Sequence, residues 1–162
     1  MNSKSDQELN KALFIVCPFC HTEEFLRVKF GKDIFFSTFP GAVLNHKTED
    51  ELLLNELINR EGISEIFIVN DISCNFIENA IDGKKEFGLK CETHLKELNS
   101  KLSDEFKLLS LNEKKEIMAK TNVLEQLCYL KTLKNLKQKL DDNKINLHAM
   151  VTDKNFGFEI VK

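Results

Sequence analysis

Short apolar runs recur in the first half of the chain and are separated by amphipathic segments. Segment 12–17 (ALFIVC) is continuously apolar, as is typical of a strand covered on both faces in a parallel sheet. Segments 33–37 and 66–69 predict two further strands. The alternation of strands with helical segments favours a sheet that is mostly parallel.

Helical patterns fill the gaps between these strands. Thr22 can cap a helix that carries two glutamates in its first turn, where the helix dipole favours negative charge. Thr48 and Glu51 have the spacing of a capping box and predict the start of a second helix, which ends near Gly62. We expect the second helix to present one apolar face made of Leu53, Leu54, Leu57 and Ile58.

The second half of the chain begins with further helical patterns. Ser73 is a plausible cap for a short helix through about Asp82, and segment 87–102 is also predicted to be helical. Ser110 and Glu113 make another capping box, which opens a long helical pattern. Leucines recur along this pattern at intervals of three or four, at Leu124, Leu127, Leu130, Leu133, Leu136 and Leu140.

Two final strands, 145–151 and 156–161, read as an antiparallel hairpin joined by a short turn. The chain is therefore expected to be one α/β domain over 1–162, with a mostly parallel sheet, helices on both faces and a C-terminal antiparallel strand. Ligands of such sheets bind beyond the carboxyl ends of the strands. The loops 17–21 and 70–74 lie at such ends, and both carry cysteine.

Composition narrows the classes of partner. The chain has 162 residues and a formal net charge of -3, which gives no basic field for a nucleic-acid backbone. No apolar stretch approaches the roughly 20 residues that span a bilayer, and the N-terminus lacks the apolar run of a signal peptide. We therefore expect a cytoplasmic protein without nucleic-acid or membrane partners, in which the five cysteines are reduced thiols. Cys91 and Cys128, within helical patterns, are expected in the core.

Cys17 and Cys20 form a CPFC motif between a strand and a helix, which looks like the dithiol site of a glutaredoxin. A cysteine at a helix N-terminus is acidified and can attack disulfides. The fold of those redox proteins also needs a proline directly before a later strand. Pro40 is the other proline of this chain, and it follows a strand instead. A thiol redox protein is therefore retained as an alternative only.

A second hypothesis combines residues from the two loops into one metal site. Cys17 follows the first strand, and the motif Asp71-x-x-Cys74 follows the third. Thiolates and carboxylates are zinc ligands, and three protein ligands with an open fourth position describe a catalytic zinc site. The sequence thus predicts zinc held by Cys17, Asp71 and Cys74.

The order of motifs over nearly the whole chain resembles the β-carbonic anhydrases. That family has a C-x-D-x-R motif, an R-N-A-G-N-like loop, a G-x-x-x-I strand that leads to H-x-x-C, an N-V-x-x-Q helix and a closing hairpin. The matching segments here are CPFCH (17–21), TFPGA (38–42), GISEIFIVNDISC (62–74), NVLEQLCYL (122–130) and HAMVTDKNFG (148–157). The resemblance implies a homodimeric zinc enzyme that hydrates carbon dioxide to bicarbonate.

The departures from the family pattern fall on its chemistry. The resemblance makes Cys17 and Cys74 zinc ligands, but Asp71 stands where the family has its histidine ligand. Phe19 occupies the position of the catalytic aspartate, and His21 that of its arginine partner. A phenylalanine cannot accept a hydrogen bond from zinc-bound hydroxide, and histidine lacks the bidentate grip of arginine on a carboxylate.

Nearby residues could repair the site. Cys20 is a possible substitute zinc ligand, and His21 could shuttle a proton or bind metal. Three functions follow from these residues. The first is a carbonic-anhydrase-like protein with a modified zinc site, little or no hydratase activity and a binding or regulatory role toward carbon dioxide, bicarbonate or another small anion. The second is an active, divergent zinc-dependent carbonate dehydratase. The third is the CxxC redox protein.

Overall fold

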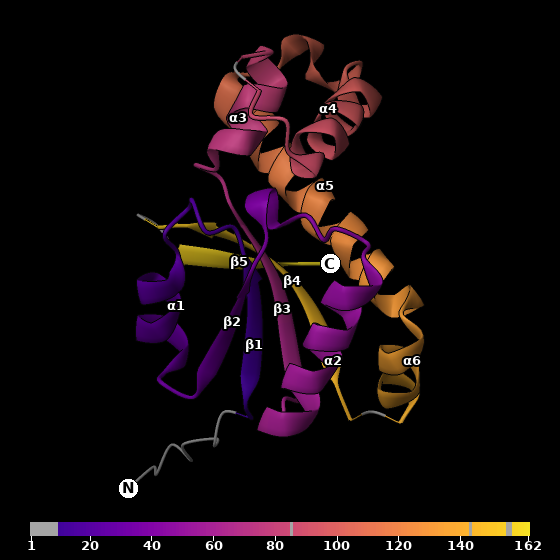
Figure 1. Ribbon diagram of the computed structural model, residues 1–162. Coiled ribbons are helices and arrows are strands. Elements are labelled where there is room, and N and C mark those ends of the chain that lie inside the picture. The colour runs from indigo at the N-terminus through magenta and orange to yellow at the C-terminus, as the bar shows by residue number, and fades with distance from the viewer. Residues whose placement is uncertain (1–9, 85, 143, 155–156) are drawn as a thin grey trace, which may run out of the picture.

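The computed structural model of the chain describes residues 10–84, 86–142, 144–154 and 157–162. At its centre is a five-stranded sheet with the order β2-β1-β3-β4-β5 (Figure 1). The strands are β1 (Ala12–Val16), β2 (Ile34–Thr38), β3 (Glu65–Asp71), β4 (Asn146–Asp153) and β5 (Gly157–Val161). The first four are parallel, and β5 pairs antiparallel with β4. The predicted α/β class and its terminal antiparallel strand are therefore confirmed; Phe156, the expected first residue of the last strand, lies outside the described residues.

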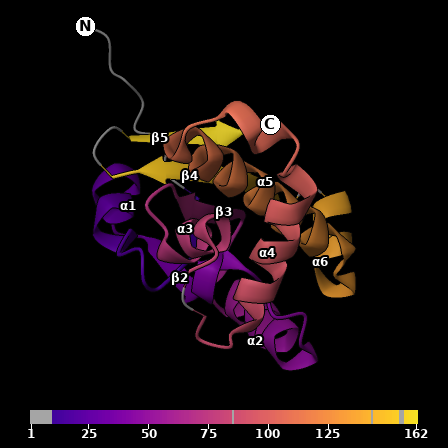
Figure 2. The ribbon, with the colours of Figure 1, turned by 90° about the horizontal axis from the view of Figure 1, so that it is seen from above.

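Helices cover both faces of this sheet (Figure 2). They are α1 (Glu23–Phe30), α2 (Thr48–Glu61), α3 (Asn75–Asp82), α4 (Lys90–Leu102), α5 (Leu111–Thr132) and α6 (Lys134–Asp141), with short 3₁₀ segments η1 (Pro40–Ala42) and η2 (Glu105–Leu108). Helix α1 lies on one face, and α2, α5 and α6 lie on the other. Helices α3 and α4 sit above the carboxyl ends of the strands (Figure 1).

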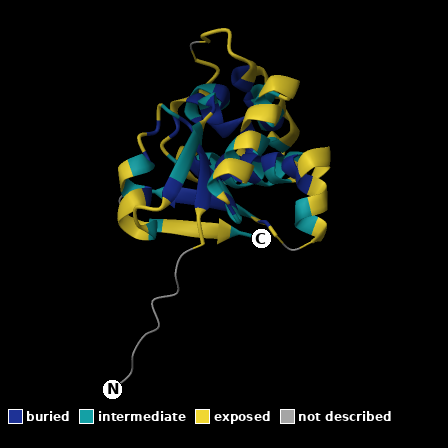
Figure 3. Ribbon diagram, turned by 60° about the horizontal axis from the view of Figure 1, so that its bottom comes forward, coloured by how far each residue is buried: buried dark blue, intermediate teal, exposed yellow. Residues whose placement is uncertain are grey.

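Strand β1 divides its side chains between two apolar clusters, as the alternation of a pleated strand requires. Leu13 and Ile15 belong to the larger cluster beneath α2 to α6, whereas Phe14 belongs to a smaller, aromatic cluster beneath α1. All five residues of β1 are buried, which explains why its sequence is apolar without interruption. Figure 3 shows the same contrast between the buried central strands and the exposed outer turns of the helices.

Helix starts differ in part from the sequence prediction. The Ser110–Glu113 capping box that opens α5 is confirmed. The Thr48–Glu51 box is wrong, because α2 already begins at Thr48 and no side chain caps it. Ser73 is not the cap of α3 either, because Cys74 holds that position. The Ser73 hydroxyl donates to the Asp71 carboxylate instead.

The leucine pattern predicted one long helix, but the structure breaks it at Leu133. Leu133 has an extended backbone (φ -70°, ψ 120°), so that α5 ends before it and α6 starts after it. This break keeps Leu133 and Leu136 both buried. Two other exposures differ from expectation: Leu53 is 70% exposed, and Cys128 faces solvent rather than the core. Within the described part of the chain, no helix combines the length and apolarity that crossing a bilayer requires.

Candidate metal centre

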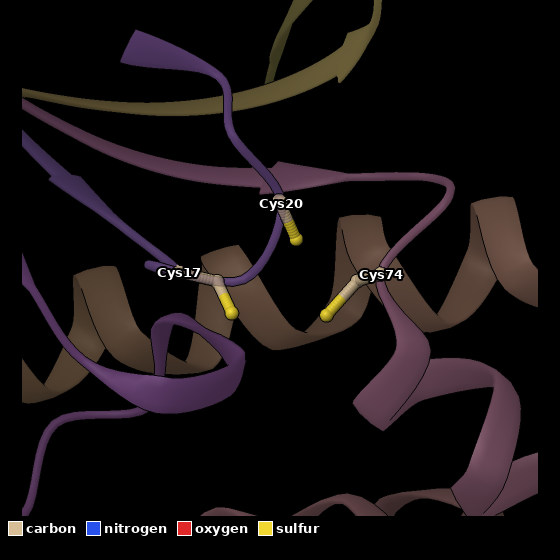
Figure 4. A group of neighbouring side chains, drawn as sticks. All are labelled: Cys17, Cys20 and Cys74. Atoms are coloured by element: carbon tan, nitrogen blue, oxygen red, sulfur yellow. The ribbon is translucent and has the colours of Figure 1, made fainter.

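Three cysteines meet at the carboxyl edge of the sheet. Cys17 directly follows β1, Cys20 lies three residues later in the same turn, and Cys74 follows β3 as the N-cap of α3. Strands β1 and β3 are parallel neighbours, so the loops that leave them lie side by side. Figure 4 shows the three side chains pointing toward one another.

The three sulfur atoms all lie within 4.8 Å of one another. A tetrahedral zinc site with Zn–S bonds of about 2.3 Å would hold its sulfurs roughly 3.8 Å apart, so the observed spacing is close to that of a metal-thiolate cluster. Among the described histidine, cysteine, aspartate and glutamate side chains, this is the one group of three or more with ligand atoms so close. Each cysteine is at most 4% exposed.

The pKa values of the three thiols are shifted in opposite directions. Cys17 accepts hydrogen bonds from the thiols of Cys20 and Cys74, and these bonds outweigh its burial and lower its pKa to about 3. The backbone N–H of Gly41 also donates to the Cys17 sulfur, at 3.2 Å. The same contact with Cys17 raises the pKa of Cys20, and it raises the pKa of Cys74 to about 12. The hydrogen bonds among these thiols therefore favour the thiolate form of Cys17 over those of Cys20 and Cys74.

Asp71 lies outside this group, although the sequence predicts it as a ligand. Its side chain is buried, and both of its oxygens accept hydrogen bonds from protein donors. The Ser73 N–H donates to Oδ1 at 2.9 Å, the Ser73 hydroxyl donates to the same oxygen, and the Thr152 hydroxyl donates to Oδ2 at 2.8 Å. A metal at Asp71 would have to share this carboxylate with the donors of Ser73 and Thr152.

Phe19 and His21 flank the cysteines without joining them. His21 is exposed on a turn with a positive φ of 52°. Phe19 is 58% exposed and packs edge-on against Phe76, with ring centroids 5.5 Å apart. Both phenylalanines therefore belong to one aromatic contact, and the motif resemblance predicts an aspartate at Phe19. Beside it lies a cavity of about 440 Å³ lined by Phe19, Asn75, Phe76, Asn79, Lys84, Phe87 and Leu89.

Sequence reasoning missed several polar groups around the cysteines. The Lys154 ammonium donates to the Cys20 carbonyl from the turn between β4 and β5, and the Gly41 amide lies against Cys17. Asn70 and Asn122 are completely buried nearby. Of these groups, only Asn70 could have been noticed from the local sequence, because it is a polar residue at the end of the otherwise apolar run IFIVN of β3.

Comparison with known proteins identifies the fold. No protein-family profile and no curated protein matches the sequence. Solved structures do match. Wild-type β-carbonic anhydrase CafD of Aspergillus fumigatus superimposes with a TM-score of 0.81 at 20% identity, over 100% of this chain and 95% of that one. A tetrameric β-carbonic anhydrase of Sordaria macrospora gives a TM-score of 0.79 at 14% identity, over 94% and 80% of the two chains.

A third match is the Coccomyxa β-carbonic anhydrase in complex with acetazolamide, with a TM-score of 0.75 at 13% identity over 94% of this chain and 72% of that one. The chain thus has a β-carbonic-anhydrase-like fold, as its motif order predicts. At this level of identity the likeness establishes the fold.

Proposed function

We propose that this chain is a carbonic-anhydrase-like metalloprotein in which Cys17, Cys20 and Cys74 hold zinc, and that it hydrates carbon dioxide weakly or not at all. The observation that carries the proposal is the convergence of three buried sulfurs at the carboxyl edge of a β-carbonic-anhydrase-like sheet. Asp71, the ligand expected from sequence, is engaged by Ser73 and Thr152, which favours Cys20 as the third ligand.

The donor set fits zinc. Thiolates are strong zinc ligands, and three of them leave a fourth coordination position for water or another small ligand. Zinc in such a site supplies a Lewis acid that lowers the pKa of a bound water. Three thiolates give the site a net charge of about -1 with Zn²⁺, whereas two thiolates and a neutral imidazole balance the ion. The extra negative charge opposes ionisation of a bound water.

The surroundings of the cysteines also disfavour hydration. An aspartate that could accept a hydrogen bond from a metal-bound hydroxide is replaced by Phe19, whose ring packs on Phe76. The thiols themselves are at most 4% exposed, so that a small substrate has little direct access to a metal held between them. These features support a site that binds metal more effectively than it turns over carbon dioxide.

We also propose that the chain self-associates, with a homodimer as the expected form. The Sordaria macrospora enzymes of the same fold are tetrameric. Strand β5 forms an edge of the sheet, and its Phe158 and Ile160 are exposed large apolar residues. An edge strand with exposed apolar side chains is a common place for pairing with another chain. Light scattering coupled to gel filtration should give a mass of at least two chains.

The test of function combines metal analysis with a kinetic assay. Purified protein should contain about one zinc per chain, and Cys17→Ser should lose it. Cys128→Ser is the matched control, because Cys128 is exposed and lies outside the cluster. Stopped-flow carbon dioxide hydration should not exceed the rate of free zinc in the same buffer. A zinc-free wild-type protein would refute the metal site, and fast hydration would refute the weak activity and favour the active enzyme.

A thiol redox protein is the second candidate. The CPFC sulfurs lie within 4.8 Å of each other, and the lowered pKa of Cys17 gives the thiolate that such chemistry requires. Attack of the Cys17 thiolate on a small disulfide releases one thiolate. The Cys20 sulfur, losing its proton, then displaces the second thiol and closes the Cys17–Cys20 bond. Mass spectrometry after treatment with oxidised glutathione should show that bond if this candidate is correct, and its absence would exclude it.

A further inference from the structure

Gly41 brings a backbone donor to the sulfur of Cys17. Its N–H lies 3.2 Å from Cys17 Sγ. Gly41 has a φ of 65°, and a Cβ added there would come within 3.3 Å of Cys91 Cβ and of the Leu95 side chain. The positive φ favours glycine, and a side chain at this position would crowd Cys91 and Leu95. The amide is thus held in a narrow gap beside the Cys17 sulfur.

The carbonyl of Gly41 is bound by two side-chain amides from distant parts of the chain. Asn70 at the end of β3 and Asn122 in the middle of α5 each donate from Nδ2 to this oxygen at 3.1 Å. Asn122 Nδ2 also donates to Asn70 Oδ1 at 2.5 Å. Both asparagines are 0% exposed. Burial of an amide is costly unless it is hydrogen-bonded, and here the shared partner is Gly41.

Helix α5 holds the same loop at a second point. One turn after Asn122, Gln126 accepts the N–H of Leu44 through Oε1 at 3.0 Å. Gln126 Nε2 lies 3.4 Å from Asn122 Oδ1, and His94 Nε2 lies 3.1 Å from the same oxygen. Asn122 is therefore hydrogen-bonded on both sides, and these bonds tie the loop from Gly41 to Leu44 to β3 and α5.

From these contacts we infer that Asn70 and Asn122 are positioning residues for the metal site, which act by keeping the Gly41 N–H on the sulfur of Cys17. The inference rests on the proposed function, since it concerns the same thiolate. A hydrogen bond from outside the ligand set orients a ligand atom and tunes its charge. Neither carboxamide is hydrogen-bonded to any of the three cysteines in the described part of the chain, and both are hydrogen-bonded to Gly41.

Two measurements on one set of variants test this inference. Asn122→Leu replaces the carboxamide with an apolar side chain of similar size. Asn70→Ser replaces the other carboxamide with a hydroxyl group on a shorter side chain. Leu130→Ala is the control, because Leu130 is fully buried in α5 but is not part of the polar chain. Cobalt(II) affinity and the thiolate-to-cobalt charge-transfer spectrum report on the ligands. In metal-free protein, the NMR shift and hydrogen exchange of the Gly41 amide report on the positioning alone.

Both asparagine variants should weaken cobalt affinity by about tenfold to a hundredfold, shift the charge-transfer band and make the Gly41 amide exchange faster. Leu130→Ala should lose stability but keep its affinity within about twofold, because its apolar side chain makes none of these hydrogen bonds. An unchanged Gly41 amide in either folded asparagine variant would overturn the inference, as would a perturbed amide with unchanged cobalt binding. If wild-type protein binds no cobalt, the proposed function fails, and the Gly41 amide alone then decides whether the asparagines position this loop.

Discussion

Two buried polar clusters lie at the same edge of the sheet, and their hydrogen bonding differs. In the first, Asp71 has both carboxylate oxygens occupied by the donors of Ser73 and Thr152. In the second, the thiols of Cys17, Cys20 and Cys74 hydrogen-bond to one another, and the Gly41 N–H donates to the Cys17 sulfur. The Asp71 carboxylate thus already has three protein donors. We therefore expect a metal ion to bind the thiols in preference to Asp71.

The largest effect is expected from the third zinc ligand, which is either Cys20 or Asp71. Cys20→Ser should lower zinc affinity by more than about a hundredfold, because a ligand is lost rather than a supporting residue. Asp71→Asn should change zinc affinity by less than about threefold. Competition with a chromophoric chelator measures both. The opposite ranking of the two variants would place Asp71 in the site and Cys20 outside it.

Proton release upon metal binding distinguishes the same two ligand sets. The pKa of Cys20 is raised and that of Cys74 is raised to about 12, so both thiols carry protons near neutral pH and must lose them to bind zinc. Zinc binding to all three cysteines should release the protons of Cys20 and Cys74, and affinity should fall as pH falls. Calorimetry in buffers of different ionisation enthalpy counts the protons released. A site in which Asp71 replaces Cys20 would release fewer protons, because it displaces none from Cys20.

A smaller effect is expected on the stability of the metal-free protein. Here Asp71, which we expect to matter little for zinc affinity, should be important. Asp71→Asn removes one acceptor from a cluster that includes the fully buried Thr152 hydroxyl. The free energy of unfolding of the metal-free protein should fall by about 1–3 kcal/mol. Asp104→Asn is the control, because the Asp104 side chain is 88% exposed, and it should change stability by less than about 0.5 kcal/mol. Equal effects in urea denaturation would mean that the Asp71 cluster is not a structural one.

Much of the fold was predictable from short-range patterns. The uninterrupted apolar run of β1 indicated a doubly covered strand, and the alternation of elements indicated parallel neighbours. The meeting of the loops after β1 and β3 follows from that alternation. The break at Leu133 was not predictable from spacing, because an extended leucine that remains buried preserves the same periodic pattern.

The sequence indicated the two loops and named Cys17, Cys20 and Cys74, which the structure brings together, but it also placed Asp71 among the ligands. Spacing favoured Asp71 because it stands three residues before Cys74, as the resemblance required. What engages Asp71 in the structure is partly Thr152, 81 residues away, and no local pattern reports such a contact. The same holds for Asn122, which reaches Gly41 across 81 positions. Long-range hydrogen bonds therefore decide which of the predicted ligands point toward one another.

X-ray absorption of the zinc-loaded protein counts the atoms bound to the metal and so shows directly whether three cysteines hold it. We expect three sulfur scatterers at about 2.3 Å, with at most one lighter atom beside them. Two sulfurs together with two or more oxygen or nitrogen atoms would contradict this and would show that one of the three cysteines is not a ligand.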